Sequence, residues 1–369
     1  MTVLKGNAGE WSELYAMFQL LIQGELTQEY SHLNEDRSDL KVLAVKRSLD
    51  DGDVLLKRVK GGIEVSNKNG RQIVAKETLE NAAASILDSL NTDGKEARAF
   101  PIPGVEDFIR ALGFNSVKAK SSQKSDLFVQ LEDLKSESNP WLGFSVKSAI
   151  SQPATLLNPS GLTRFEFRIG RYAGEFSKEE LKRLAECESV SDRITGIRTL
   201  GGRFEFIGIT GATFSNNLRT IDSRMPELVA ELVLDKFVSK ESDLKILSRR
   251  LSERNPFGFS RVDLHNYYEY KIKKLLSESA LGMIAKSPWS GKHSATGGFL
   301  VVNSDGSISG YHFFNQNEFE NYLLENTMLD LPSTGKRHPY GSISVVDGEL
   351  RILLILQIRF KKIKKPAAK

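Results

Sequence analysis

The spacing of apolar residues changes its period along this chain, and that change limits the folds it can form. In residues 9–23 the apolar side chains from Trp11 to Ile22 recur at helical spacing and form one stripe. Short apolar runs at 42–45, 53–59 and 62–65, bounded by Asp-Gly and Gly-Gly turns, instead predict strands. This alternation predicts an α/β fold rather than an all-helical or all-β one.

The remaining patterns continue the alternation. Helices are predicted at 76–90, 105–112, 177–188, 226–238, 243–251 and 262–277. Strands are predicted at 127–131, 142–146, 163–169, 204–209, 298–303, 309–314, 342–346 and 350–358. We therefore expect a central mixed sheet flanked by helices, in three regions. These are an N-terminal β/α subdomain (1–95), a core (96–215), and a helical segment followed by a β-rich region (216–369).

Composition excludes several classes of protein. The single cysteine, Cys187, excludes an internal disulfide framework and a zinc site built on several thiolates. The apolar runs are too short to span a bilayer, and the first residues lack the apolar core of a signal peptide. We therefore expect a cytoplasmic protein. The chain is nearly neutral, but the residues after Phe360 are rich in lysine, which fits either contact with nucleic acid or a solvated chain end.

One pair of predicted strands brings chemically useful residues together. Asp126 directly precedes the first strand, and Ser145 and Lys147 end the second. A hairpin centred between residues 136 and 137 would place Asp126 opposite Lys147, and the period of two places Ser145 on the same face as Lys147. The carboxylate and the Val146 carbonyl could then hold a divalent cation, while the ammonium balances charge on a phosphate. An ordinary cross-strand salt bridge is the alternative interpretation.

This arrangement resembles the PD-(D/E)xK nuclease core, with Ser145 at the middle acidic position. Motifs across most of the chain are similar to HpaII-type restriction endonucleases: Gly6-Asn-Ala-Gly-Glu-Trp, Phe144-Ser-Val-Lys-Ser, Thr155-Leu-Leu-Asn-Pro-Ser-Gly, Leu329-Asp-Leu-Pro-Ser-Thr and Leu356-Gln-Ile-Arg-Phe. The resemblance implies a restriction-endonuclease-like fold and a Type II enzyme that cuts double-stranded DNA at a short palindrome, CCGG or a related site, with Mg²⁺. By the family pattern, Asp126 binds the metal and Lys147 is the catalytic lysine.

The resemblance also implies a prokaryotic enzyme, a homodimer on its palindromic site, and a cognate DNA methyltransferase as a functional partner without direct contact. Two alternatives stay open. One is a nuclease of the same fold with another task, and the other is a DNA-binding protein without catalysis.

Ser145 leaves the second metal carboxylate unassigned. Glu13 and Glu10 lie three apart on the first predicted helix, so they share one flank, and either could complete the site. Glutamate in a first helical turn is also expected from the helix dipole alone. Glu166, on the strand at 163–169, is the third candidate, although a solvated stripe of paired charges would explain it equally well.

Basic residues near glycine-containing loops are the candidates for DNA contacts, because arginine reads guanine bidentately and lysine holds phosphates. Arg164, Arg168 and Arg171 follow the predicted hairpin, and two further pairs lie in loops: Lys292 with His293, and Arg337 with His338. Solvated surface positions are the alternative for each of them.

Overall fold

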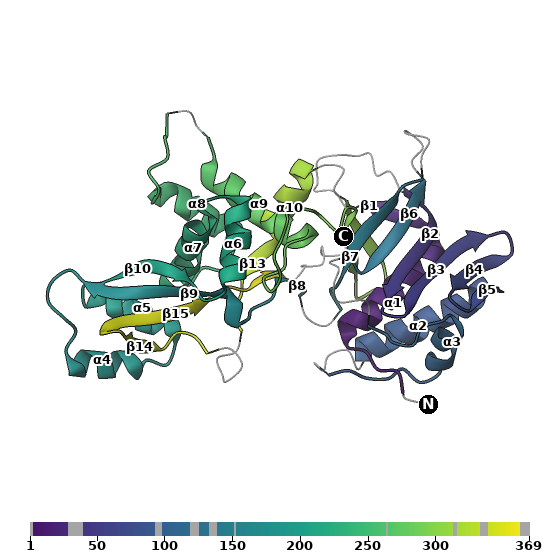
Figure 1. Cartoon of the computed structure of the whole chain (residues 1–369), viewed down its shortest axis with the longest axis horizontal. Helices are drawn as coiled ribbons and strands as arrows, with labels where there is room; N and C mark the ends of the chain where they lie inside the picture. The colour runs from purple at the N-terminus through teal and green to yellow at the C-terminus, as the bar shows by residue number, and fades with distance from the viewer. Residues whose placement is uncertain are drawn as a thin grey trace, which may run out of the picture.

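The computed structural model describes residues 3–28, 40–92, 98–118, 125–132, 139–150, 153–262, 265–312, 316–332 and 339–361. In Figure 1 these residues form two lobes, one built on a nine-stranded sheet and the other on two smaller sheets. The predicted α/β fold with a large mixed sheet flanked by helices is confirmed. Within the described part of the chain, no helix combines the length and apolarity needed to cross a membrane.

The first lobe contains a nine-stranded sheet in the order β1-β12-β11-β7-β6-β2-β3-β4-β5. Its strands are β1 (Glu25–Gln28), β2 (Leu40–Leu49), β3 (Gly52–Val59), β4 (Gly62–Asn67), β5 (Gly70–Val74), β6 (Leu127–Glu132), β7 (Trp141–Ser148), β11 (Gly298–Val302) and β12 (Ile308–His312). The pairs β1–β12 and β11–β7 are parallel and the others antiparallel. Three helices pack on this sheet (Figure 1): α1 (Ala8–Gln23), α2 (Lys76–Thr92) and α3 (Glu106–Ala111).

Helix α1 is fixed at both ends by its own sequence. Asn7 and Glu10 form a capping box, in which each side chain accepts a hydrogen bond from the other's backbone amide. Gly24 ends the helix at φ 77°, a left-handed conformation that favours glycine. The stripe predicted from the sequence is buried, and Trp11, Leu14 and Phe18 are fully inaccessible. The helix therefore lies in one orientation on the sheet.

The second lobe combines two small sheets with seven helices among the described residues. Its strands are β8 (Thr155–Leu157), β9 (Arg164–Arg171), β10 (Gly202–Ile209), β13 (Thr327–Leu329), β14 (Ile343–Val346), β15 (Glu349–Ile355) and β16 (Ile358–Phe360). They form sheets in the orders β10-β9-β15-β14 and β13-β16-β8. The helices are α4 (Lys178–Ala185), α5 (Val190–Thr199), α6 (Ala212–Ile221), α7 (Met225–Ser239), α8 (Leu244–Arg254), α9 (Tyr267–Leu281) and α10 (Gln316–Asn326).

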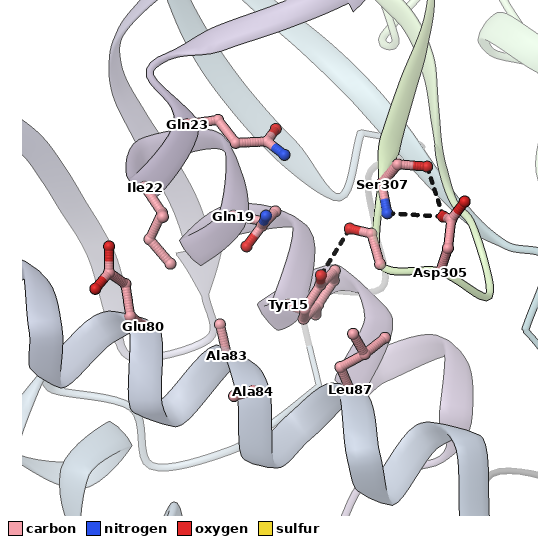
Figure 2. Close-up of a pocket in the computed structure, with 11 residues that line it drawn as sticks. Tyr15, Gln19, Ile22, Gln23, Glu80, Ala83, Ala84, Leu87, Asp305 and Ser307 are labelled. Carbon is pink, nitrogen blue, oxygen red and sulfur yellow. Dashed lines mark hydrogen bonds between the residues drawn. The ribbon is translucent and has the colours of Figure 1, made fainter.

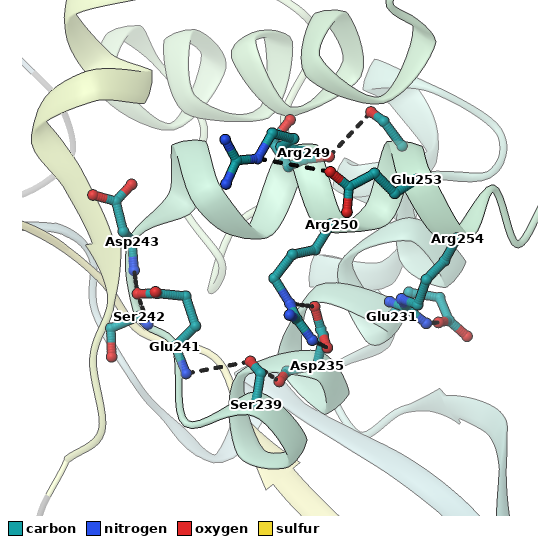
Figure 3. Close-up of polar contacts among 12 residues, drawn as sticks. Glu231, Asp235, Ser239, Glu241, Ser242, Asp243, Arg249, Arg250, Glu253 and Arg254 are labelled. Carbon is teal, nitrogen blue, oxygen red and sulfur yellow. Dashed lines mark hydrogen bonds and ion pairs between the residues drawn. The ribbon is translucent and has the colours of Figure 1, made fainter.

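Ion pairs join two of these helices. Arg250 of α8 donates two hydrogen bonds to the buried carboxylate of Asp235 on α7, at 2.9 and 3.1 Å (Figure 3). Arg254 reaches Glu231, one turn earlier on α7, at 3.0 Å. Asp235 is 5% exposed, so its charge is balanced by a bidentate partner rather than by water.

Strand β11 joins the two lobes because both of its faces are buried. Phe299 and Val301 belong to the core of the second lobe, whereas Leu300 and Val302 belong to the core of the first. The alternation of side chains along a strand produces this division. The nine-stranded sheet contains strands from both sides of the predicted boundary at residue 95, since β2 pairs with β6. The three-region division at 95 and 215 remains a proposal.

Several elements were missed because their sequence signals are short. The strands β1, β5 and β8 have five residues or fewer, and the helices α5 and α6 have ten each. The helix that was predicted to begin at residue 262 begins instead at Tyr267. Predicted turns at 51–52 and 304–307 do join hairpins, β2–β3 and β11–β12.

Phe299 provides a test of the connection between the lobes. Its ring is 1% exposed and lies 4.8 Å from Tyr311 and 5.4 Å from Phe360, centroid to centroid. We expect Phe299→Ala to lower the free energy of unfolding by about 3–5 kcal/mol, as large aromatic truncations in cores do. Val345→Ala, at a position 68% exposed on β14, is the control. Urea denaturation measures both, and equal midpoints for the two variants would contradict the assignment.

Candidate functional site

Asp126, Ser145 and Lys147 meet at one end of the β6–β7 hairpin, but in a different register from the predicted one. Leu127 pairs with Phe144, so Asp126, one residue earlier, faces Ser145. The prediction that Asp126 lies opposite Lys147 is therefore wrong by two residues. The strand patterns suggested a hairpin centred between residues 136 and 137. In the structure Leu131 pairs with Pro140 through a 3.2 Å backbone hydrogen bond, so the centre of the hairpin lies earlier in the chain.

The carboxylate of Asp126 is held by the strand opposite. Its Oδ2 atom accepts hydrogen bonds from the Val146 amide at 2.7 Å and from the Ser145 hydroxyl at 3.1 Å. Its own amide donates to the Phe144 carbonyl at 2.8 Å. Both side-chain bonds use one oxygen, which leaves Oδ1 available to another ligand. Ser145 therefore orients the acidic residue instead of supplying a second carboxylate.

Lys147 lies two residues beyond Ser145 on β7, so the two side chains share a face of the sheet. In the parallel register with β11, Ser145 is beside Phe299 and Lys147 is beside Val301. Both β11 residues belong to the core of the second lobe, so this face of the sheet is the one directed toward that lobe. Within the described residues, the Lys147 ammonium forms no hydrogen bond or ion pair, and it is free to act on a ligand.

Helix α1 carries Glu13, and charges on Asp126 and Lys147 act on its carboxyl group. One Glu13 oxygen forms an ion pair with Nη2 of Arg47 on β2, and that nitrogen also donates to the Val117 carbonyl at 2.8 Å. The Arg47 side chain is fully buried and that of Glu13 is 16% exposed. Nε and Nη1 of Arg47 have no hydrogen-bond partner among the described residues. Such a pair is costly to break, because it would leave a buried charge without a partner.

The shift in the pKa of Glu13 is caused in part by the charged groups that lie near it. Burial raises this pKa from 4.5 to about 8, Arg47 lowers it, and the negative charges of Asp126 and Glu10 raise it further. Lys147 also lowers the pKa of Glu13. Asp126 and Lys147 therefore each lie within electrostatic range of Glu13, although the three residues are far apart in the chain.

The other two residues proposed for a metal have structural partners. The carboxylate of Glu10 accepts the Asn7 amide at 2.8 Å in the capping box of α1. The Val146 side chain packs in the core of the first lobe, and its amide holds Asp126. Glu13, the other glutamate of α1, has a pKa that the charge of Asp126 raises.

The donor set fits a hard cation bound by few protein ligands. No group of three or more His, Cys, Asp or Glu side chains suited to a metal occurs in the described ranges. The charge of Asp126 nevertheless raises the pKa of Glu13, so the two carboxyl groups disfavour being ionised together. A divalent cation would relieve that repulsion, and Mg²⁺ commonly binds proteins through one or two carboxylates while keeping several waters.

Glu166 and the three arginines after the hairpin belong to a different sheet. Glu166 on β9 forms an ion pair with Arg351 on β15 at 3.0 Å, and it does not contribute to the pKa of Glu13. Arg168 pairs with Glu349 at 3.4 Å, and Arg171 makes a two-pronged contact with Glu180 at 3.0 and 3.2 Å.

The donors of Arg164 are directed to backbone carbonyls, including that of Gly161 at 3.1 Å. These arginines are engaged within the second lobe, and their DNA contacts remain proposals.

Two of the four loop residues proposed to contact DNA belong to the described residues, and the other two do not. Lys292 is exposed, and His293 lies 2.6 Å from the Glu278 carboxylate through Nε2. Arg337 and His338 lie outside the described residues.

The site is not part of either of two cavities in the structure. One, of about 440 Å³, lies between α1, α2 and the β11–β12 turn, where the Tyr15 hydroxyl donates to the Gly306 carbonyl at 2.7 Å (Figure 2). The other, of about 300 Å³, is lined by residues of α6 and α9 and by Trp289. Neither includes Asp126, Ser145 or Lys147.

Arg47 is the residue of this site that sequence reasoning missed. The strand pattern held a signal for it: Val45, Arg47 and Leu49 alternate, so the period of two places Arg47 on the buried face. An arginine at such a position needs an acidic partner, and Glu13 on the facing helix provides it.

Comparison with known proteins identifies the family of this chain. A family described as HpaII restriction endonuclease matches residues 7–360. The chain is 37% identical over 358 residues to the Type II restriction enzyme HpaII of Haemophilus parainfluenzae, which covers 96% of this chain and 98% of that enzyme. No solved structure matches the chain. Since both similarities extend over nearly its whole length, the chain belongs to the HpaII restriction endonuclease family.

Proposed function

We propose that this restriction endonuclease hydrolyses both strands of double-stranded DNA at CCGG or a related palindrome, with Mg²⁺ as its cofactor. The observation that carries the proposal is the placement of Asp126, Ser145 and Lys147 at one end of β6–β7, with Glu13 under the electrostatic influence of Asp126 and Lys147, in a chain of this family. The relative named above is a Type II enzyme, which supports a fixed cleavage site. A palindrome is matched by two-fold symmetry, so we propose that a homodimer acts on it.

The residues divide the chemistry among them. Asp126 and Glu13 would hold the cation, with the Val146 carbonyl as a further oxygen ligand. A bound Mg²⁺ supplies positive charge beside the phosphate that is cleaved. Ser145 and the Val146 amide fix the Asp126 carboxylate through Oδ2. Lys147, on the same face as Ser145, orients a water molecule or balances the charge that develops on the phosphate oxygens. A cognate methyltransferase would protect the host DNA without contacting this enzyme.

The first prediction concerns cleavage. Wild-type enzyme should convert a defined plasmid into discrete fragments, and sequencing their ends should give one palindromic site. We expect Asp126→Ala and Lys147→Ala to lower the cleavage rate by about 10²–10³ while DNA binding is retained, because each removes a transition-state contact. Lys57→Ala, on an exposed position of the same sheet, is the control. Cleavage by Lys147→Ala at the rate of Lys57→Ala would overturn the assignment. Binding without cleavage by the wild type would indicate a DNA-binding protein instead.

The second prediction concerns the metal. Mg²⁺ or Mn²⁺ should support cleavage, Ca²⁺ should support binding without efficient cleavage, and a chelator should stop the reaction. Glu13→Gln should raise the Mg²⁺ concentration needed for half-maximal rate, because the amide keeps the shape and removes the charge. Glu166→Gln should not, since Glu166 is paired with Arg351 in the other lobe. A shift for Glu166→Gln alone would move the second ligand to β9.

The third prediction concerns pH in the absence of metal. The folded pKa of Glu13 is about 8, above its ordinary value of 4.5, so the folded protein holds this proton where the unfolded chain has lost it. The resulting stability is fully present below the ordinary pKa and is lost as pH rises through the folded pKa. Urea midpoints measured in EDTA between about pH 5 and about pH 9 should fall more for wild type than for Glu13→Gln. Parallel pH profiles would contradict this.

A further inference from the structure

Residues 292–297 form the last part of the connection between α9 and β11, and we call them the 292–297 segment. They contact the hairpin that carries the candidate site. The first contact is next to Asp126. Ser125, which is 6% exposed, donates a hydrogen bond from its hydroxyl to the Ser294 carbonyl. The segment therefore touches the residue that leads directly into the acidic side chain.

Two further contacts are next to Ser145. The Gly143 amide, two residues earlier on β7, donates to Thr296 Oγ1 at 3.1 Å. The Gly297 amide donates in return to the Gly143 carbonyl at 2.7 Å. Both contacts use the backbone of Gly143, so the segment lies along the edge of β7 that also pairs with β11.

Glycine at position 143 is what allows this close approach. A Cβ atom there would lie 2.4 Å from Ser125 Oγ and 2.6 Å from the Ser294 carbonyl oxygen, both too short for real contacts. The carbonyl belongs to the backbone, so it could yield only by moving the segment. Any larger residue at 143 would therefore push the segment off the hairpin.

The other end of the segment is bound to the second lobe. The amides of Ser294 and Ala295 both donate to the carbonyl of Leu281, the last residue of α9, at 3.0 and 2.9 Å. His293 contacts Glu278, one turn earlier on the same helix. The position of α9 and the position of the catalytic hairpin are thus linked through six residues.

We propose that the 292–297 segment positions Asp126 and Ser145 for catalysis, and that Thr296 is a positioning residue through its bond to Gly143. The inference rests on the proposed function of Asp126. A carboxylate held by hydrogen bonds from Ser145 and Val146 moves whenever β7 moves. A displacement of about 1 Å in a catalytic group can cost on the order of 10² in rate. The segment fixes β7 on the side that β6 does not pair with.

The test compares Thr296→Val, which keeps the shape and removes the oxygen, with Thr296→Ser, which keeps the oxygen. We expect Thr296→Val to lower kcat by about tenfold or more, with the KM for DNA and the Kd in Ca²⁺ unchanged. Thr296→Ser should restore kcat to within about threefold of wild type. Ser290→Ala, an exposed position in the preceding loop, is the control, and thermal melts of all variants show that each is folded.

A fall in kcat with Thr296→Val that Thr296→Ser rescues supports the proposal. Wild-type kcat in Thr296→Val, a loss that Thr296→Ser does not rescue, or a change confined to KM would overturn it. If Thr296→Val does not fold, Gly143→Ala is measured in its place. We expect Gly143→Ala to lower kcat in the same way, and its kcat then decides whether the proposal holds. Failure of the proposed function is a separate result: wild type would then not cleave, or Asp126→Ala would cleave normally.

Discussion

The buried ion pair between Arg47 and Glu13 is the interaction on which the candidate site depends most. It joins β2 to α1 at a point where neither charge has ready access to water. Charges in such a place are retained only when each has a partner, so the pair fixes the helix against the sheet. The cost is visible in the raised pKa of Glu13, to which burial and the charge of Asp126 both contribute.

The position of the site follows from which face of β7 is used. Ser145 and Lys147 share the face that is directed toward the second lobe, and β11 connects the two cores beside them. The described contacts of the β9 arginines lie within the second lobe, with Glu349 on β15, Glu180 on α4 and backbone carbonyls as partners. The 292–297 segment is hydrogen-bonded to both lobes, to Leu281 of α9 and to Gly143 of β7.

The α/β class and most helices and strands could be predicted from the sequence, whereas the roles of Asp126, Ser145, Lys147 and Glu13 stay predictions. Periodicity was sufficient for long elements such as α1, because burial of a stripe is decided by spacing within one segment. It was insufficient for short strands such as β1 and β8, which exist because distant strands offer hydrogen-bonding edges. No local pattern contains that information.

The same limit applies to the site. The sequence by itself determined which residue types stand next to each strand, and hence that Ser145 and Lys147 share a face. Only the tertiary structure decided that Asp126 faces Ser145, that Arg47 neutralises Glu13, and that Glu166 lies in another sheet with Arg351 as its partner. The physical reason is that register and pairing depend on contacts between residues far apart in the chain, whereas the pleat of a strand is a property of its own backbone.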